Sequence, residues 1–115
     1  MKVISKESQI SVNELKEMAQ KMFGNLVKAV VDTKNEIMAV DAELHADQEA
    51  LLIEKGSKQE NLWGINLYPD LEGSDFIEFD SMINLRPSQN NRSRSVENPE
   101  TQKTIIKIVN KLVTK

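Results

Sequence analysis

The only histidine of the chain lies in a short segment rich in carboxylates. His45 stands among Asp41, Glu43, Asp47 and Glu49. Asp41 and His45 fall on one side in a strand, where side chains repeat every two residues, and also in a helix, where positions four apart are neighbours. Nearby carboxylates raise the pKa of a histidine and can orient it as a general base, and nitrogen and oxygen ligands together can hold a divalent metal. We therefore take His45, Asp41 and Asp47 as candidate catalytic residues, with Glu49 as a further orienting or metal-binding group.

The spacing of this segment matches no strong metal motif. It reads H-x-D-x-E and lacks the second histidine of H-E-x-x-H. The alternative is a solvated segment in which Asp47 caps a helix that runs through Lys55 and is followed by Gly56 in the left-handed conformation. The segment therefore indicates either a small metal-assisted hydrolase or nuclease, or an ordinary helix start, and no resident cofactor is expected.

A second segment, residues 86–95, is rich in side chains that recognise anions. It holds three arginines, three serines and two asparagines but no acidic residue. Arginine forks, hydroxyls and amides bind phosphate or carboxylate groups, and the segment leads toward a helix N-terminus. The candidate binding residues come from this segment and from the position just before it: Asn84, Arg86, Ser88, Asn91, Arg92 and Arg94.

Two observations qualify that interpretation. The segment has no aromatic residue for base stacking and no glycine pattern of a phosphate-binding loop, so nucleic acid is a weakly supported partner. The alternative is a hydrogen-bonded surface loop whose arginines pair with Asp75, Glu78 and Asp80. An anionic ligand, a nucleic acid and internal ion pairing are thus all open at this point.

Charge is unevenly distributed over the 115 residues, which carry 18 acids and 15 bases. Residues 86–115 hold seven basic and two acidic residues, a balance of +5, whereas residues 1–85 hold eight basic and 16 acidic residues, a balance of −8. Such a split indicates an anionic partner for the basic part or attraction between two regions of one fold.

The length and composition of the chain exclude several classes of protein and of site. The chain is long enough for one hydrophobic core, so we expect a single globular domain over residues 1–115. The absence of cysteine excludes disulfides, thiolate catalysis and cysteine-ligated metals. No run approaches the roughly 20 apolar residues of a membrane helix and no apolar signal core opens the chain, so we expect no membrane association and a cytoplasmic location.

Capping signals predict three helices. Ser11 opens an S-x-x-E capping box and predicts a helix over residues 12–22 that ends at Gly24. The second helix is the one expected from Asp47. Asn98 and Pro99 begin the last helix, whose buried stripe comprises Ile105, Ile106, Val109, Leu112 and Val113.

Apolar alternation predicts two hairpins, with strands at 26–32 and 36–44 and at 62–68 and 76–85. A short extra strand at 2–5 is compatible with the pattern. The second hairpin has an unusually polar face, made of Asn66, Tyr68, Glu78, Asp80, Asn84 and Arg86. The resulting α-β-β-α-β-β-α order predicts an α+β fold with the three helices packed on one face of an antiparallel sheet.

Four blocks of the chain resemble a known family. They read F-G-x-x-V-K-A-V-V-D at 23–32, E-L-H-A-D-x-E-A-L-L at 43–52, G-S-K-Q-x-x-L-W-G-I-N-L-Y-P at 56–69 and F-D-S-M-I-N-x-R-P-S-x-x-N-R-S-R at 79–94. Together they resemble a family of short prokaryotic proteins classed as a domain of unknown function, over residues 10–113. The resemblance implies a cytoplasmic domain and brings no activity, substrate or cofactor.

Three functional hypotheses follow. The first is a non-enzymatic binding domain whose polar sheet face and 86–95 segment recognise an anionic ligand or partner. The second is the small metal-assisted hydrolase or nuclease with His45 as general base. The third is a structural homo-oligomer, favoured if Trp63 or Met82 is exposed on an apolar patch.

Overall fold

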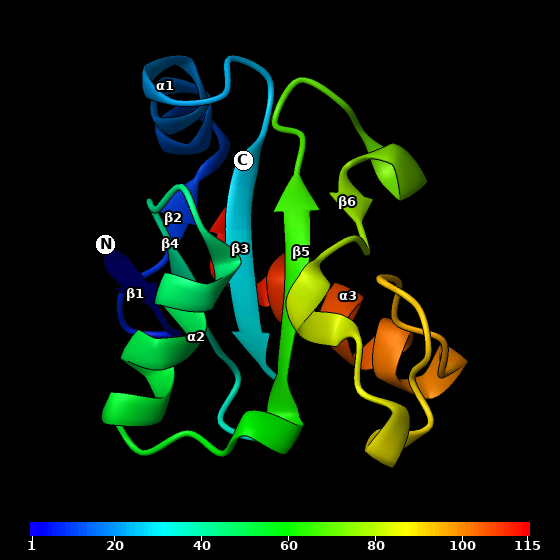
Figure 1. The fold of residues 1–115 in the computed structure, drawn as a ribbon. Coiled ribbons are helices and arrows are strands. Elements are labelled where there is room, and N and C mark those ends of the chain that lie inside the picture. The colour runs from blue at the N-terminus through cyan, green and yellow to red at the C-terminus, as the bar shows by residue number, and fades with distance from the viewer.

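A computed structural model describes residues 1–115, and its main feature is a five-stranded sheet (Figure 1). The strand order is β1-β4-β3-β5-β6, and every neighbouring pair is antiparallel. The five strands are β1 (Lys2–Ile4), β3 (Val27–Asp32), β4 (Ile37–Val40), β5 (Leu62–Leu67) and β6 (Ile77–Glu78). Two further strands, β2 (Ile10–Ser11) and β7 (Val113–Thr114), form a small parallel pair.

The three α-helices begin where capping chemistry satisfies their first backbone N–H groups. In α1 (Val12–Lys21) the Ser11 hydroxyl accepts the Glu14 N–H at 3.1 Å, and in α3 (Pro99–Leu112) the Asn98 amide accepts the Glu100 N–H at 2.8 Å. Gly24, at φ +89°, closes α1, as the sequence predicts. The helix α2 (His45–Glu54) starts at His45, two residues before the predicted cap, so Asp47 lies in its first turn.

Helices cover both faces of the sheet. Residues Val27, Ala29 and Val31 of β3 join the main core cluster with side chains of α1 and α3, whereas Val30 packs on the other side in a cluster with Leu52 of α2. In Figure 1 α2 lies in front of the sheet and α3 behind it. The expectation that all three helices pack on one face is therefore wrong. The physical reason is that β3 is buried on both sides and needs apolar cover on each.

The second hairpin forms only in part. β5 matches its prediction. The prediction of a strand over 76–85 is wrong, because β6 ends at Glu78. The chain then crosses β5 at Gly64, where an added Cβ would lie only 2.5 Å from the Ser81 Cβ. Asn84 replaces the missing strand, since its side-chain oxygen accepts the Gly64 N–H at 2.8 Å and its amide donates to the Gly64 carbonyl at 2.9 Å.

Four 3-10 helices complete the chain: η1 (Gln59–Asn61), η2 (Gly73–Asp75), η3 (Met82–Asn84) and η4 (Pro87–Gln89). Of these, η3 lies in the region where a strand was expected, and η4 follows it. The strand predicted at 2–5 is present as β1, which pairs with β4 at the edge of the sheet. No helix has both the length and the apolar character needed to cross a lipid bilayer.

Candidate functional site

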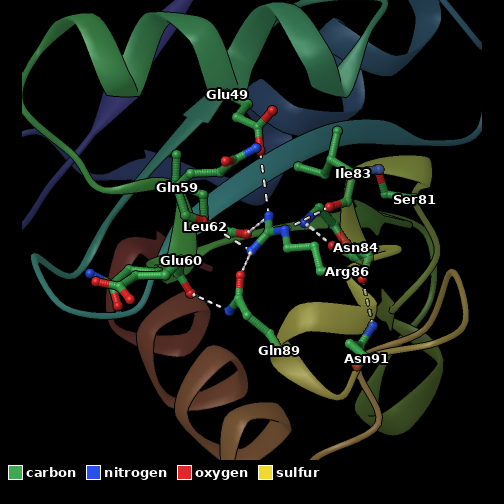
Figure 2. A network of polar contacts seen from close by, with 12 residues as sticks. Glu49, Gln59, Glu60, Leu62, Ser81, Ile83, Asn84, Arg86, Gln89 and Asn91 are labelled. Carbon is green, nitrogen blue, oxygen red and sulfur yellow. Dashed lines mark hydrogen bonds and ion pairs between the residues drawn. The ribbon is translucent and has the colours of Figure 1, made fainter.

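Arg86 is the centre of a buried polar network that joins three parts of the fold (Figure 2). Only 8% of the residue is exposed. Its guanidinium carries five N–H donors, and five protein acceptors surround it: the backbone carbonyls of Gln59, Leu62 and Ile83, and the side chains of Glu49 and Gln89. The donors of Arg86 are therefore fully engaged within the protein.

Two of the groups around Arg86 interact directly with its charge: Glu49, one of the five acceptors, and the ring of Trp63. Its Nη2 lies 3.4 Å from the Glu49 carboxylate, and its guanidinium carbon lies 4.8 Å from the centre of the Trp63 ring. Burial lowers the pKa of Arg86, and the negative charge of Glu49 opposes that change. Glu49, predicted to support His45, instead serves as the carboxylate partner of Arg86.

Asn84 and Asn91 are also buried and engaged. Besides its bonds to Gly64, Asn84 donates to the Arg94 carbonyl at 2.9 Å. Asn91 donates to the carbonyls of Asn84 and Ser95, both at 2.7 Å, and accepts the Glu97 N–H at 2.9 Å. Side chains that are satisfied in this way hold the segment in one conformation. They order the 81–95 segment rather than presenting free donors.

The other predicted binding residues lie at the surface. Arg94 pairs with Asp80 through its Nε, at 2.6 Å, so the alternative of internal ion pairing is confirmed for this residue. Ser88 and Arg92 are exposed, and the Arg92 side chain has no ion-pair partner in the protein. An anion-binding role for Ser88 and Arg92 stays a prediction.

A polar cleft of about 790 Å³ lies beside the Arg86 network. It runs between the turn after β3, η1, η4 and the first half of α3. Thirteen residues line it, and Trp63 is the only hydrophobic one. The cleft shares three residues with the network of Figure 2, namely Glu60, Gln89 and Asn91. The network therefore forms one wall of the cleft.

Several cleft side chains are free to bind a ligand. Gln89 donates to the Glu60 carbonyl and Thr33 to the Asn61 carbonyl, but the side chains of Asn61, Asn90 and Thr101 take part in no internal hydrogen bond. The indole N–H of Trp63 is likewise unused, although the residue is only 7% exposed.

The cleft carries more negative than positive charge. Its lining includes the carboxylates of three glutamates and a single basic side chain, Lys34. The glutamates are Glu60, Glu97 and Glu100. Glu97 accepts the Arg92 N–H at 3.2 Å, and Glu100 lies 3.5 Å from Lys103, so Glu60 is the carboxylate without a protein partner. This charge balance suits a neutral or positively charged ligand better than an anion.

Sequence patterns did not reveal this cleft. Trp63 lies in the predicted strand 62–68, where it alternates with the apolar side chains of Ile65 and Leu67, and the lining residues come from four separate parts of the chain. The only local signals were the polar stretches at 58–61 and 89–91, which are also typical of solvated loops. The cleft exists because the 81–95 segment folds back toward α3, and that path depends on contacts distant in sequence.

His45 is buried between α2 and the sheet rather than exposed among carboxylates. Its Nε2 donates to the Ile65 carbonyl at 2.7 Å, which leaves Nδ1 as the unprotonated nitrogen of the neutral ring. Burial lowers the pKa of His45; the bond to Ile65 and the charge of Asp80 oppose this, while the charges of Lys28 and Arg94 add to it. The expectation that carboxylates raise this pKa is therefore wrong.

The other members of the predicted catalytic segment lie apart from the ring. Asp41 is half-buried in the turn before α2 with φ +67°, and Asp47 is exposed on the first turn of α2. No group of three histidine or acidic side chains is placed to hold a metal ion. The charges that influence the pKa of His45 are those of Lys28 in β3 and of Asp80 and Arg94, rather than those of Asp41 and Asp47.

A polar patch next to His45 continues the predicted polar sheet face. Glu78 accepts hydrogen bonds from Asn66, at 2.8 Å, and from the Tyr68 hydroxyl, at 2.9 Å. Burial and the bond to Glu78 raise the pKa of Tyr68. The side-chain oxygens of Asn66 and Gln48 are buried and have no partner. The patch is thus largely self-satisfied, with two spare acceptors.

Taken together, the antiparallel sheet and the helices on both of its faces define a small α+β protein, with a polar cleft beside α3. The chain belongs to a family described as proteins of unknown function (DUF5674), whose family model matches residues 2–112. No curated protein and no solved structure matches the chain.

Proposed function

We propose that this protein is a non-enzymatic binding domain whose polar cleft takes a small, hydroxyl-rich ligand without net negative charge, such as a sugar or a nucleoside. The observation that carries the proposal is the composition of the cleft, in which one of 13 lining residues is hydrophobic. Its volume, about 790 Å³, falls in the range of small-molecule sites.

The chemistry of the lining favours hydroxyl groups. A hydroxyl donates one hydrogen bond and accepts others, so its partners must include both acceptors and donors. The free amides of Asn61 and Asn90 supply both, the Glu60 carboxylate accepts, and the Trp63 indole donates. A phosphate offers mainly acceptor oxygens and would meet the excess of carboxylates.

The two other functions weighed from the sequence have less support. A metal-assisted hydrolase needs ligands that converge, and no three suitable side chains do so. For the homo-oligomer, Trp63 is buried and Met82 is 63% exposed; self-association stays a prediction that light scattering can test. A cytoplasmic location is part of our proposal, and cell fractionation would test it.

The experiment is an amide-shift titration of ¹⁵N-labelled protein with glucose, ribose and inorganic phosphate, added separately. We expect the neutral polyols to shift the amides of residues 60–63, 89–91 and 97–101. The variant Asn61→Ala should weaken that response, because it removes a free amide from the cleft while the Asn61 carbonyl still accepts from Thr33. Asn25→Ala is the matched control, since Asn25 is exposed and lies outside the cleft.

Three results would contradict the proposal. The first is an absence of cleft shifts with both polyols. The second is a response to phosphate alone, at Ser88 and Arg92, which would instead support the anionic ligand expected from the sequence. Equal weakening in Asn61→Ala and Asn25→Ala would show that the shifts report a general change rather than binding in the cleft.

A further inference from the structure

A second depression in the surface has the opposite chemical character. It is a groove of about 830 Å³ between the start of α1, the loop 69–76, β6 and the second half of α3. It shares no lining residue with the polar cleft. Its apolar lining includes Leu71, Phe76, Ile77, Phe79 and Ile106, and Leu71 and Ile106 are exposed.

One side of this groove is the free edge of the sheet. β6 pairs only with β5, and no further strand follows it (Figure 1). The Tyr68 N–H donates to the Phe76 carbonyl, which places Phe76 and Glu78 in the pairs that bond to β5. In an antiparallel ladder the residue between them points its N–H and C=O the other way. The backbone of Ile77 therefore faces outward, free to pair with an added strand.

The two faces of β6 differ in chemistry. Ile77 and Phe79 pack against the core cluster that α3 covers, and Glu78 pairs with Asn66 on the opposite face. A strand added beside β6 would place alternate side chains on those same two faces. One set would enter the groove next to Ile106, and the other would lie beside Glu78.

Acidic residues surround this edge. Asp70 and Glu72 line the groove together with Lys16 and Lys115, and Asp75 and Glu78 add two further acids in or next to β6. Of the four acids only Asp70 has a lysine partner, Lys16 at 3.8 Å. A strand beside β6 therefore meets negative charge on its exposed side and apolar surface in the groove. We infer that β6 and the groove bind an extended segment of a partner protein in which apolar residues alternate with lysine or arginine, by strand addition.

The test uses acetylated ten-residue peptides, one alternating Val and Lys and one alternating Val and Glu, added to the intact ¹⁵N-labelled chain. The Val-Lys peptide should shift the amides of residues 75–79 and slow hydrogen exchange at Ile77. Ile106→Glu should weaken this binding by about tenfold or more, because it places an unpaired charge in the apolar groove. Ile53→Glu is the matched control: Ile53 is 43% exposed on α2 and Ile106 is 39% exposed on α3.

Three outcomes would overturn the inference. One is the absence of protection at Ile77 with the Val-Lys peptide. Another is equal binding of the Val-Glu peptide, which would remove the charge argument. The third is protection of Ile77 in the protein alone, with a doubled mass in sedimentation, which would assign the edge to a second copy of the chain. Both variants change exposed residues, so unaltered melting temperatures would confirm that each is folded.

Discussion

The β3–β4 hairpin and the segment 79–95 are ordered by different forces. The hairpin has a regular backbone ladder, and its side chains alternate between two apolar clusters. The segment 79–95 has no strand of its own and depends on the buried side chains of Asn84, Arg86 and Asn91. The hairpin shows that apolar alternation, read locally, predicts a region that a backbone ladder and apolar cover on both faces then order. The segment shows that amide and guanidinium groups, when fully hydrogen-bonded, can replace a strand.

The largest effect should come from removing the centre of that network. Arg86→Met should lower the free energy of unfolding by about 3–5 kcal/mol, because it leaves the half-buried Glu49 carboxylate and several carbonyls without partners. Urea unfolding measures the change. Arg92→Met is the matched control, since the Arg92 side chain is exposed and unpaired, and it should leave stability unchanged. A loss of similar size in both variants would contradict the assigned role of Arg86.

Removal of the Asn84 side chain should cause the next largest loss in the free energy of unfolding. Asn84→Ala removes the only partners of the Gly64 N–H and C=O on that edge of β5, and we expect a cost of about 2–4 kcal/mol. Hydrogen exchange at Gly64 should accelerate more than exchange in the β3–β4 hairpin. Unchanged exchange at Gly64 would show that the side chain does not substitute for a strand.

A core truncation in the hairpin should behave differently. Val31→Ala should cost about 1.5–3 kcal/mol through lost apolar burial, since Val31 is inaccessible to solvent. Because the hairpin is part of the main core cluster, protection should fall in the slowest-exchanging amides throughout the sheet. A loss of protection restricted to residues 79–95 would contradict the different origins of order assigned to the two regions.

Acidification should destabilise the protein through His45. Burial holds the pKa of His45 below its usual value of 6.5, so below that pH the unfolded state binds a proton that the folded state does not. The neutral, buried His45 therefore contributes fully to the free energy of unfolding above about pH 6.5. That contribution is lost as the pH falls toward the pKa of His45 in the folded protein. His45→Gln keeps a donor for the Ile65 carbonyl and should flatten the dependence measured by urea unfolding. An unchanged slope would contradict the assignment.

The smallest effect is expected for the exposed ion pair of Arg94 and Asp80. Arg94→Ala should leave the melting temperature within experimental error, because water screens an exposed pair. A clear drop would mean that Arg94 supports the segment in the same way as Arg86. It would then remove the distinction between buried and exposed members of the 86–95 segment.

The sequence predicted those parts of the fold that depend on near neighbours. Ser11, Gly24 and Asn98 act within a few residues of their own positions, and their roles are confirmed. Alternation predicted the β3–β4 hairpin and β5 for the same reason, although β4 ends at Val40 and not at Leu44, where the prediction placed its end. Interactions between distant parts of the chain could not be predicted in this way: Asn84 is 20 residues from Gly64, and Arg86 is 37 residues from Glu49.

The contacts of the candidate site also join distant parts of the chain, so local patterns did not predict them. For the arginine, asparagine and serine side chains of 86–95, an anion-binding role and internal pairing both stayed open, because a local pattern cannot show which carbonyls lie nearby. The pKa of His45 was predicted to rise from its sequence neighbours, but burial of the ring lowers it, and the hydrogen bond to the Ile65 carbonyl opposes that change. The free cleft residues Asn61 and Asn90 carry no distinguishing pattern, since exposed amides are common in loops.

Hydrogen exchange of Arg86→Lys tests the central claim most directly, namely that the Arg86 network orders the segment that walls the cleft. Lysine keeps the positive charge but replaces a fork of five donors by three. We predict faster exchange at Ser81, Asn84 and Asn91, loss of the polyol-induced shifts in the cleft, and unchanged protection in the β3–β4 hairpin. Retained protection at these three amides, or an equal loss in the hairpin, would contradict the claim.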